Sequence, residues 1–389
     1  MSEPTLDPQR QEQARRYARQ RRRFFLVDLA LGAAYILAWL FTSLSTVLAS
    51  HLEARFPSPW LATGIYVIFF LIGYGILSLP LGYYAGYLLP RRYGLVTQSV
   101  WGWLADQAKA GALGLLFGVV ALEGIYWLLR VAPAVWWFWV GLAYLGFTVV
   151  LANLAPVLIA PLFYKFEPLD DADLTDRLIR LAERAGTRVR GVFTFNMSSK
   201  TTAANAALMG LGNTRRIILG DTLLAHYTPD EVESILAHEL AHHVHRDVPL
   251  GIAVSVVETL AGLWLADRAL RAGASALGFR GPADLAAFPL LVLVLGIFGL
   301  VTMPLGNAYS RWRERMADVY ALRATGNPHA FASAMVKLAN QNLAEAEPER
   351  WVEFLFYTHP PIGQRIRMAE EWKNQWPEHR GNEYYAIHR

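Results

Sequence analysis

The stretch PWLATGIYVIFFLIGYGILSLPLGYYAGYLL, residues 59–89, carries no charged side chain and decides the class of fold. A transmembrane helix needs about 20 consecutive apolar residues, so this stretch can cross a bilayer, either as one tilted helix or as a broken one. Five further apolar stretches carry at most one charged residue each: 24–50, 111–129, 131–164, 248–266 and 285–310. We therefore expect a mainly α-helical membrane protein with about six transmembrane helices.

The overall composition agrees with a membrane protein that also has some soluble mass. Of the 389 residues, 54% are hydrophobic and 17% are charged, against about 25% charged residues in soluble domains, and the mean hydropathy is +0.25. These values exclude disordered, collagen-like and coiled-coil classes. The chain has no cysteine, which excludes disulfide frameworks, cysteine nucleophiles and thiolate metal ligands. A metal ion in this protein must be bound by histidines and carboxylates.

The net charge of +4 lies in the N-terminal tail. Residues 1–23 contain seven arginines and three acidic residues, so this tail accounts for the whole surplus. Positive charge directly before an apolar stretch is typical of a cytoplasmic flank, and we expect no nucleic-acid partner. With the N-terminus inside, six spans place both hydrophilic segments, 165–247 and 311–389, on the cytoplasmic side. The arginines of the loop 267–284 then lie outside and fit the charge rule less well.

The first hydrophilic segment mixes helices and strands. The apolar spacing of residues 171–186 predicts a helix, and VRGVFTF at 189–195 predicts a strand. Residues 205–219 predict a hairpin or an edge strand. We interpret Gly210-Leu211-Gly212 within it as a turn, because the strand–loop–helix context of a phosphate-binding loop is missing.

The same segment ends in a metal-binding pattern. TPDE at 228–231 is typical of a capping box with proline at the first helical position, so a helix is expected to begin there. It leads to HELAH at 238–242, in which His238 and His242 share one helix face and can converge on a tetrahedral zinc ion. Glu239 lies beside them, where it can take a proton from the attacking water. Surface histidines on a polar helix are the alternative.

A catalytic zinc needs a third protein ligand. The candidate is Glu314, in SRWRERMAD directly after the last apolar stretch, and Asp318 follows one turn later on the same helix face. A carboxylate that is hydrogen-bonded to a ligating imidazole fixes its tautomer, which is the role expected of Asp318. The alternative is an exposed charged helix in which Arg311, Arg313 and Arg315 pair with these acids. Taken alone, this segment favours the alternative; its pairing with HELAH favours the metal ligand.

Other ionisable residues have open roles. His245 lies on the metal-facing side of the expected helix, whereas His243 is expected to face solvent. Glu123 and Glu258 lie deep in expected spans and face either a water-filled cavity or a neighbouring helix. Asp28 lies near a span end, where its side chain can extend toward the membrane surface.

Several ordered motifs together resemble one family, the integral-membrane zinc metalloproteases of the CAAX prenyl protease type (the a-factor-converting family). The chain is similar to this family through most of its length from residue 80 onward. The matching motifs are LPLGYY near 79–84, IAPLFYKFEPL at 159–169, NAALMGLGNTRRIILGDTLL at 205–224, HELAH at 238–242, the pattern E-x-x-A-D at 314–318, and THPP at 358–361.

The resemblance implies roles for individual residues. His238, His242 and Glu314 are implied as ligands of one zinc ion per chain, Glu239 as the general base and Asp318 as the partner of a ligand histidine. His359 is implied to stabilise the oxyanion, and Asn205 to hold substrate backbone beside an edge strand, here within residues 205–212. The resemblance also implies that the transmembrane helices form a chamber around a small α+β zincin-like domain that is split between two cytosolic segments.

The expected organisation is therefore as follows: 1–23, basic cytoplasmic tail; 24–164, four spans; 165–247, catalytic segment with the HExxH helix; 248–310, two spans; 311–389, catalytic segment with the third ligand. We expect an integral-membrane zinc endopeptidase that cleaves membrane-associated or prenylated CAAX-type polypeptides. One alternative is a bacterial quality-control protease of the inner membrane without prenyl specificity. Another is a catalytically idle scaffold with a structural metal.

Overall fold

The computed structural model describes residues 5–210 and 215–375. By their internal contacts the described residues form two units. The membrane unit comprises Arg19–Phe163 and Val248–Met303, and the catalytic unit comprises the chain up to Ala18, Tyr164–Asp247 and the chain from Pro304. Gly210 has φ +91°, as a turn requires, but Leu211 and Gly212 of the expected turn lie outside the described residues.

Six helical stretches of the described chain are long and apolar enough to cross a membrane, which confirms the expected fold class. They are Pro8–Phe41, Pro59–Arg92, Val100–Val131, Trp136–Leu162, Asp247–Ala276 and Leu285–Thr325. Large apolar side chains lie exposed on them, among them Ile76, Val257 and Val301, each at least 68% exposed. An apolar outer surface of this kind is stable in lipid, and helices meet the demand that every backbone polar group be paired there.

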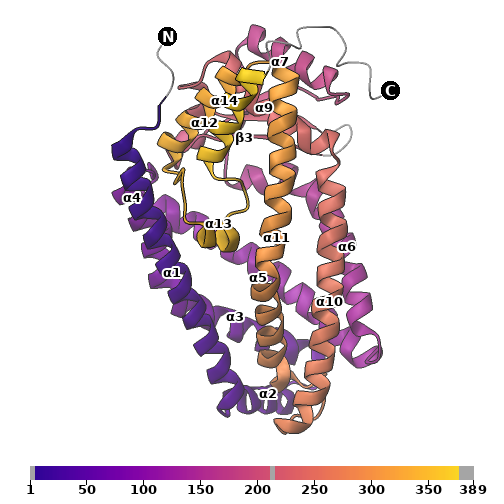
Figure 1. Cartoon of the computed structure of the whole chain (residues 1–389). Helices are drawn as coiled ribbons and strands as arrows, with labels where there is room; N and C mark the ends of the chain where they lie inside the picture. Colours follow the sequence, from indigo (N-terminus) through magenta and orange to yellow (C-terminus); the bar gives the residue numbers. More distant parts are fainter. Residues whose placement is uncertain (1–4, 211–214, 376–389) are drawn as a thin grey trace. The chain divides into compact units, whose positions relative to one another are not determined.

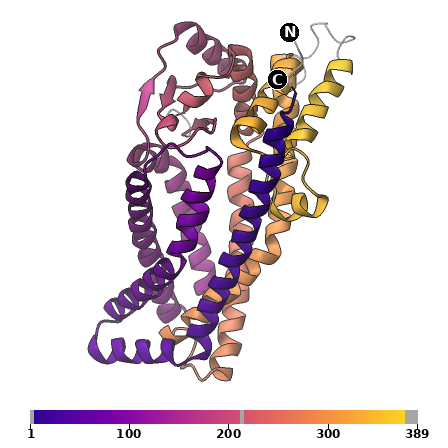
Figure 2. The ribbon, with the colours of Figure 1, turned by 90° about the vertical axis from the view of Figure 1, so that its left-hand side faces the viewer.

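The first expected span, 24–50, is interrupted. Helix α1 (Pro8–Phe41) ends before Thr42, and a separate helix α2 (Leu44–Arg55) follows across its end (Figures 1 and 2). The hydroxyl of Thr42 donates to the carbonyl of Ala38 at 2.6 Å, a side-chain bond that competes with helix continuation. The break falls in the run TSLST at 42–46, whose hydroxyl side chains are uncharged and therefore do not interrupt a stretch chosen for its lack of charge.

The stretch 59–89 is one helical span with an internal irregularity. Helix α3 (Pro59–Tyr83) runs into a π-helical turn η1 (Tyr84–Leu88) and then into α4 (Leu89–Arg92). Pro80 lacks the backbone N–H that would complete the ladder just before this turn, which favours the irregular geometry. The next spans are α5 (Val100–Val131) and α6 (Trp136–Leu154), and α6 continues through η2 (Ala155–Ile159) and η3 (Ala160–Leu162).

Helices α10 (Asp247–Ala276) and α11 (Phe288–Thr325) lie side by side in the membrane unit (Figure 1). A short turn η6 (Leu285–Ala287) precedes α11. Gly262 allows close packing of the two helices, because a Cβ there would lie 2.9 Å from the ring of Phe298. The hydroxyl of Thr302 donates to Glu258 at 2.5 Å, so Glu258 makes a polar contact between helices.

The other two acids within spans also contact neighbouring helices. The hydroxyl of Tyr74 on α3 donates to Asp28 on α1 at 3.1 Å, so Asp28 has a partner within the helix bundle. A Cβ at Gly64 would lie 3.0 Å from Glu123 Oε1, which places this acid of α5 against α3.

The catalytic unit contains a small mixed sheet. Its described strands are β1 (Phe166–Pro168), β2 (Val192–Phe195), β3 (Ala206–Met209) and β4 (Arg216–Gly220), in the order β1-β2-β4-β3. Strands β2 and β4 are parallel, and the pairs β1–β2 and β3–β4 are antiparallel. The expected strand at 189–195 and the expected pairing within 205–219 are confirmed, and β3 lies at the sheet edge.

Helices cover this sheet and complete the unit. They are α7 (Ala172–Arg184), α8 (Asp221–Leu224), α9 (Pro229–Val244), α12 (Pro328–Asn342), α13 (Arg350–Phe356) and α14 (Ile362–Gln375), with a short turn η4 (Met197–Ser199). Asp171 caps α7 by accepting from the N–H of Leu174, as the expected helix at 171–186 requires. The core joins β4, α7, α9 and α12, from which it takes buried Ile217, Leu178, Leu236 and Phe331 in that order.

Glu231 fixes the start of α9 and attaches it to α12. Its carboxylate accepts from the N–H of Thr228 and from Lys337 Nζ, both at 2.7 Å, and from the hydroxyl of Ser333. The Thr228 side chain accepts from the N–H of Glu231, so the expected capping box is confirmed. Burial opposes the carboxylate, but these donors outweigh it and lower the pKa of Glu231. This cluster therefore holds the helix that carries HELAH.

We expect Glu231→Ala to destabilise the catalytic unit by about 2–3 kcal/mol, because it removes a cap and leaves buried donors unpaired. The thermal midpoint of the detergent-solubilised protein measures this loss. Asp230→Asn, in the same helical turn but half-exposed, is the matched control and should change stability by less than about 0.5 kcal/mol. The pKa of Glu231 is lower in the folded protein than in the unfolded chain. Its carboxylate therefore stabilises the fold fully at pH values above the ordinary glutamate pKa, and this stabilisation is lost as the pH falls through the pKa of the folded state. An unchanged midpoint in Glu231→Ala at neutral pH would contradict this account.

Candidate metal centre

The two histidines of HELAH lie one turn apart on α9. Their ring centroids are 5.0 Å apart and the ring planes are nearly perpendicular, at 88°. His238 is 7% exposed, and the side chain of His242 is 23% exposed. Such a pair on one helix face presents two imidazole nitrogens to a common point.

Glu314 of α11 meets this pair. Its Oε2 lies 3.1 Å from His238 Nε2, and its Oε1 lies 3.7 Å from His242 Nε2. Ligand atoms of the three residues all lie within 4.8 Å of one another. The structure thus brings together two segments that the spans at 248–310 separate in the sequence.

The donor set fits a divalent cation. His238 Nδ1 is 2.8 Å from Asp318 Oδ1, and His242 Nδ1 is 2.7 Å from Asp247 Oδ2. Because a carboxylate can only accept, each Nδ1 carries a proton, and in the neutral form that binds a metal each ring has its Nε2 lone pair on the side of Glu314.

An unpaired oxygen at the same point supports this fit. Glu314 Oε2 is buried and has no hydrogen-bond partner in the described part of the chain, although His238 Nε2 lies close to it. When His238 is neutral, its Nε2 and this oxygen are two acceptors that face each other, an arrangement that a shared metal ion accounts for. Two histidines with a glutamate are a donor set of catalytic zinc sites.

The field around His238 is anionic. Burial alone would lower the pKa of His238, but the hydrogen bond with Asp318 and the neighbouring carboxylates outweigh it and raise that pKa to about 9. The same carboxylates favour any cation at this point.

Glu239 lies between the two histidines on α9 and is half-buried. Burial raises the pKa of its carboxyl above the ordinary glutamate range, and positive charge on His238 and His242 opposes that rise. A raised pKa suits a group that accepts and returns a proton near neutral pH.

The two residues implied only by the resemblance are His359 and Asn205. His359 Nε2 is 3.3 Å from Glu314 Oε1, so its exposed ring faces the His-His-Glu group. Asn205 is exposed and directly precedes β3, the edge strand that packs against α9. Its backbone carbonyl accepts from the N–H of Gly220 at 2.9 Å.

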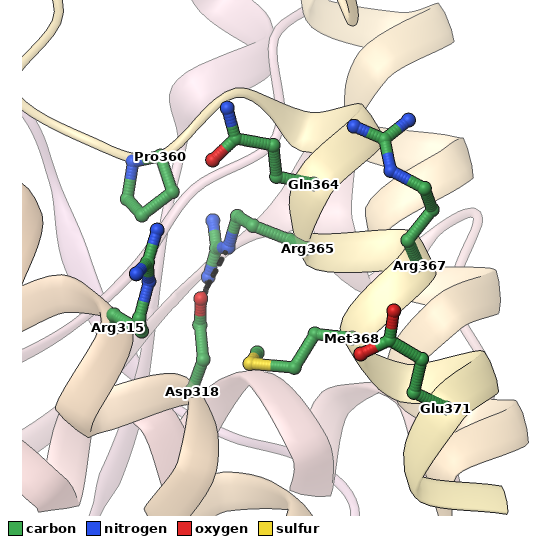
Figure 3. Close-up of a pocket in the computed structure, with 8 residues that line it drawn as sticks. All are labelled: Arg315, Asp318, Pro360, Gln364, Arg365, Arg367, Met368 and Glu371. Carbon is green, nitrogen blue, oxygen red and sulfur yellow. Dashed lines mark hydrogen bonds and ion pairs between the residues drawn. The ribbon is translucent and has the colours of Figure 1, made fainter. Parts of the chain in front are cut away.

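Asp318 is fully buried and has a second partner that the sequence did not reveal. Arg365 of α14 donates from Nε to Asp318 Oδ2 at 2.9 Å, and one terminal nitrogen donates to Oδ1 (Figure 3). A cavity of about 280 Å³ lies on this side of the pair. It is lined by Arg315, Asp318, Pro360, Gln364, Arg365, Arg367, Met368 and Glu371.

The alternative of an exposed charged helix around Glu314 is wrong. Arg311 and Arg313 are not on an exposed face: their side chains are 14% and 12% exposed, and only Arg315 of the three is exposed. The neighbouring histidines differ from what the sequence predicted. His243 is half-buried and does not face solvent. His245 packs edge-on against Tyr320 at 5.7 Å and is not part of the His-His-Glu group.

In the described residues, six membrane-length helices and a helix-borne His-His-Glu group are the features expected of a membrane-embedded metalloprotease. Comparison with known families agrees: peptidase family M48 matches residues 168–373, and the domain described as CAAX prenyl protease N-terminal, five membrane helices, matches residues 2–165. The chain belongs to peptidase family M48. Four of the six candidate spans, together with the short helix α2, lie within the second match.

Two relatives and one solved structure illustrate the similarity. The "Uncharacterized metalloprotease YhfN" of Bacillus subtilis is 30% identical over 370 residues, which cover 94% of this chain and 86% of the relative. "CAAX prenyl protease 1" of Saccharomyces cerevisiae is 26% identical over 409 residues, with coverages of 96% and 89%. The crystal structure of S. mikatae Ste24p shares the fold, with a TM-score of 0.84, 22% identity and coverages of 94% and 90%.

Proposed function

We propose that this metalloprotease is a zinc endopeptidase in which His238, His242 and Glu314 bind one zinc ion per chain. The supporting observation is that their ligand atoms lie within 4.8 Å of one another while carboxylates engage both Nδ1 atoms. Zinc, when bound, polarises the scissile carbonyl and lowers the pKa of a water ligand to about 7. A buried donor set without thiolates suits a hydrolytic centre of this type.

The residues around the ion move protons and hold charge. Glu239 accepts a proton from the attacking water and passes it to the leaving amine nitrogen. His359 Nδ1 lies 2.9 Å from the hydroxyl of Thr358. When that hydroxyl donates to Nδ1, the ring proton is on Nε2, and His359 donates it to the oxyanion of the tetrahedral intermediate.

The substrate is proposed to bind as an added strand. Strand β3 lies at the edge of the described sheet and packs against α9, so an extended peptide paired with it passes close to HELAH. Asn205, exposed at the start of β3, is proposed to bind substrate backbone through its side-chain amide.

We propose membrane-associated polypeptides as the substrates, with prenylated CAAX-type peptides as the first class to test. The similarity to a yeast protein named CAAX prenyl protease 1 across 96% of this chain supports that class. The alternative is quality control of membrane proteins without prenyl specificity. The bacterial relative, a metalloprotease of unspecified substrate, is consistent with it.

Paired peptides distinguish these substrate classes. One quenched fluorescent CAAX-type peptide is supplied with and without a farnesyl group on its cysteine. Burial of a prenyl chain contributes about 0.8 kcal/mol per methylene-sized group, so we expect kcat/KM for the farnesylated peptide to be at least about tenfold higher. Equal rates on the two peptides would reject prenyl specificity and favour the quality-control alternative, whereas hydrolysis of neither would count against both.

The proposed location is the bacterial inner membrane, with both catalytic segments on the cytoplasmic side. The seven arginines of residues 1–23 support this orientation through the positive-inside rule. We propose the following segments along the chain: a tail at 1–23, four spans in 24–164, a catalytic segment at 165–247, two spans in 248–310 and a catalytic segment at 311–389. The lipid bilayer and a peptide or membrane-protein substrate are the proposed partners.

A further inference from the structure

Each ligand histidine is the first member of a chain that runs from histidine to aspartate to arginine. In the inner chain, His238 contacts Asp318, and Asp318 contacts Arg365. In the outer chain, His242 contacts Asp247, and Asp247 contacts Arg313. Beyond the His-His-Glu group the two chains contain four charged side chains, Asp318, Arg365, Asp247 and Arg313. Three of these, Asp247, Arg313 and Arg365, have no role in the chemistry proposed above.

The inner chain is buried. Asp318 is 0% exposed and Arg365 is 8% exposed. Arg365 Nε lies 2.9 Å from Asp318 Oδ2, and a terminal nitrogen lies 3.4 Å from His238 Nδ1 (Figure 3). A buried carboxylate without a countercharge is strongly unfavourable, so Arg365 makes it possible for Asp318 to lie behind the ligand as an anion.

The outer chain fixes a tight turn. Arg313 Nε donates to Asp247 Oδ1 at 2.6 Å, and a terminal nitrogen of the same side chain donates to the carbonyl of His245 at 3.0 Å. Between these two contacts lies Arg246, whose φ of +54° is in the left-handed region that side chains rarely adopt. Arg313 therefore holds the α9–α10 turn on both sides of a strained residue, and the turn directs Asp247 onto His242.

Both arginines come from the segment that supplies the third ligand. Arg313 directly precedes Glu314 on α11, and Arg365 lies on α14, whereas the two histidines belong to α9. The chains thus connect the two halves of a centre that 63 residues of membrane spans and loop, 248–310, separate in the sequence.

We propose that Arg313 and Arg365 are positioning residues that act through Asp247 and Asp318 to aim both Nε2 atoms at the metal and to join the two halves of the site. This inference rests on the zinc site proposed above. Residues that orient a ligating histidine in this way typically change metal affinity by 10–100-fold when they are replaced.

Arg313 permits the sharper test because its helix offers a matched control. Arg315 lies two residues further on α11 and is exposed, so Arg315→Gln removes the same charge without touching the outer chain. Asp247→Asn preserves the size of the aspartate while removing its charge. Arg313→Lys retains the charge but not the paired donors, and should restore only part of the effect.

The measurement is zinc affinity of the full-length protein in detergent, by competition with a chromophoric chelator, together with the absorption spectrum of the cobalt-substituted protein. We expect Arg313→Gln and Asp247→Asn each to weaken zinc binding about 10–100-fold and to alter the cobalt spectrum. The variant that carries both Arg313→Gln and Asp247→Asn should bind zinc at most about threefold more weakly than Asp247→Asn alone, because the arginine acts through the aspartate. Arg315→Gln should bind like the wild type.

The outcomes separate the two proposals. If the wild type binds no zinc, the proposed zinc site is wrong. If the wild type binds zinc and Arg313→Gln binds it equally well with an unchanged cobalt spectrum, the positioning role is wrong while the zinc site stands. The same holds if the losses of zinc affinity in Arg313→Gln and Asp247→Asn multiply in the double variant. Should Arg313→Gln fail to fold, Asp247→Asn alone decides, since wild-type affinity in that variant overturns the outer chain.

Discussion

Glu239→Gln is expected to lower kcat for peptide hydrolysis by about 10³-fold or more while the protein retains zinc. The amide has nearly the size of the carboxylate but cannot accept a proton from water, and general base catalysis contributes about 10²–10⁴-fold. The three proposed ligands are unchanged in this variant, and Glu239 is only half-buried, so the helix should fold normally. A quenched peptide assay in detergent, with zinc content measured on the same sample, gives both values.

Glu233→Gln on the same helix is the matched control. Glu233 pairs with Arg177 and Arg184 and makes no contact with the His-His-Glu group, so kcat should stay within about twofold of the wild type. Zinc-loaded Glu239→Gln that hydrolyses peptide at the wild-type rate would show that Glu239 is not the base. That outcome would favour the alternative of a scaffold with a structural metal. Membership of a peptidase family argues against this alternative.

The parts of the site that the sequence predicts are those determined by local spacing. The capping box at 228–231 and the i, i+4 histidines depend on neighbours within one or two helical turns, and α9 begins and continues as those patterns require. The contact of Glu314 with these histidines is long-range. The sequence predicts it because HELAH requires a third ligand and because Glu314 lies directly after the last apolar stretch, one turn before Asp318 on the same helix face.

The arginines and Asp247 were missed for a physical reason. Whether a charged side chain faces solvent or a buried partner depends on tertiary contacts, which periodicity on one helix does not encode. Arg313 and Arg315 look alike in the sequence, yet Arg313 reaches Asp247 across 66 residues of chain and Arg315 is exposed. A signal did exist for Asp247: an acid five residues after a ligand histidine, where the helix ends, is within reach of its Nδ1.

Glu314→Ala is expected to weaken zinc binding by at least about 10³-fold and to abolish hydrolysis at ordinary zinc concentrations. Loss of a direct ligand should exceed the 10–100-fold effect of an orienting partner. It also leaves His359 without its 3.3 Å carboxylate neighbour. In the wild type, a chelator should remove activity and added zinc should restore it, whereas the variant should not recover at the same zinc concentration.

Thermal stability provides a readout that does not depend on turnover. A ligand that binds only the folded protein stabilises it by about 4 kcal/mol at a thousand times its Kd, so zinc should raise the thermal midpoint of the wild type and leave that of Glu314→Ala nearly unchanged. Glu347→Gln removes an exposed carboxylate of the same segment, paired with Arg367, and should respond to zinc like the wild type. Because the histidine–aspartate contacts persist in Glu314→Ala, a full zinc-induced shift in that variant would mean that the ion binds without Glu314. The 4.8 Å grouping of the three side chains would then be a buried ion-pair cluster and not a coordination site.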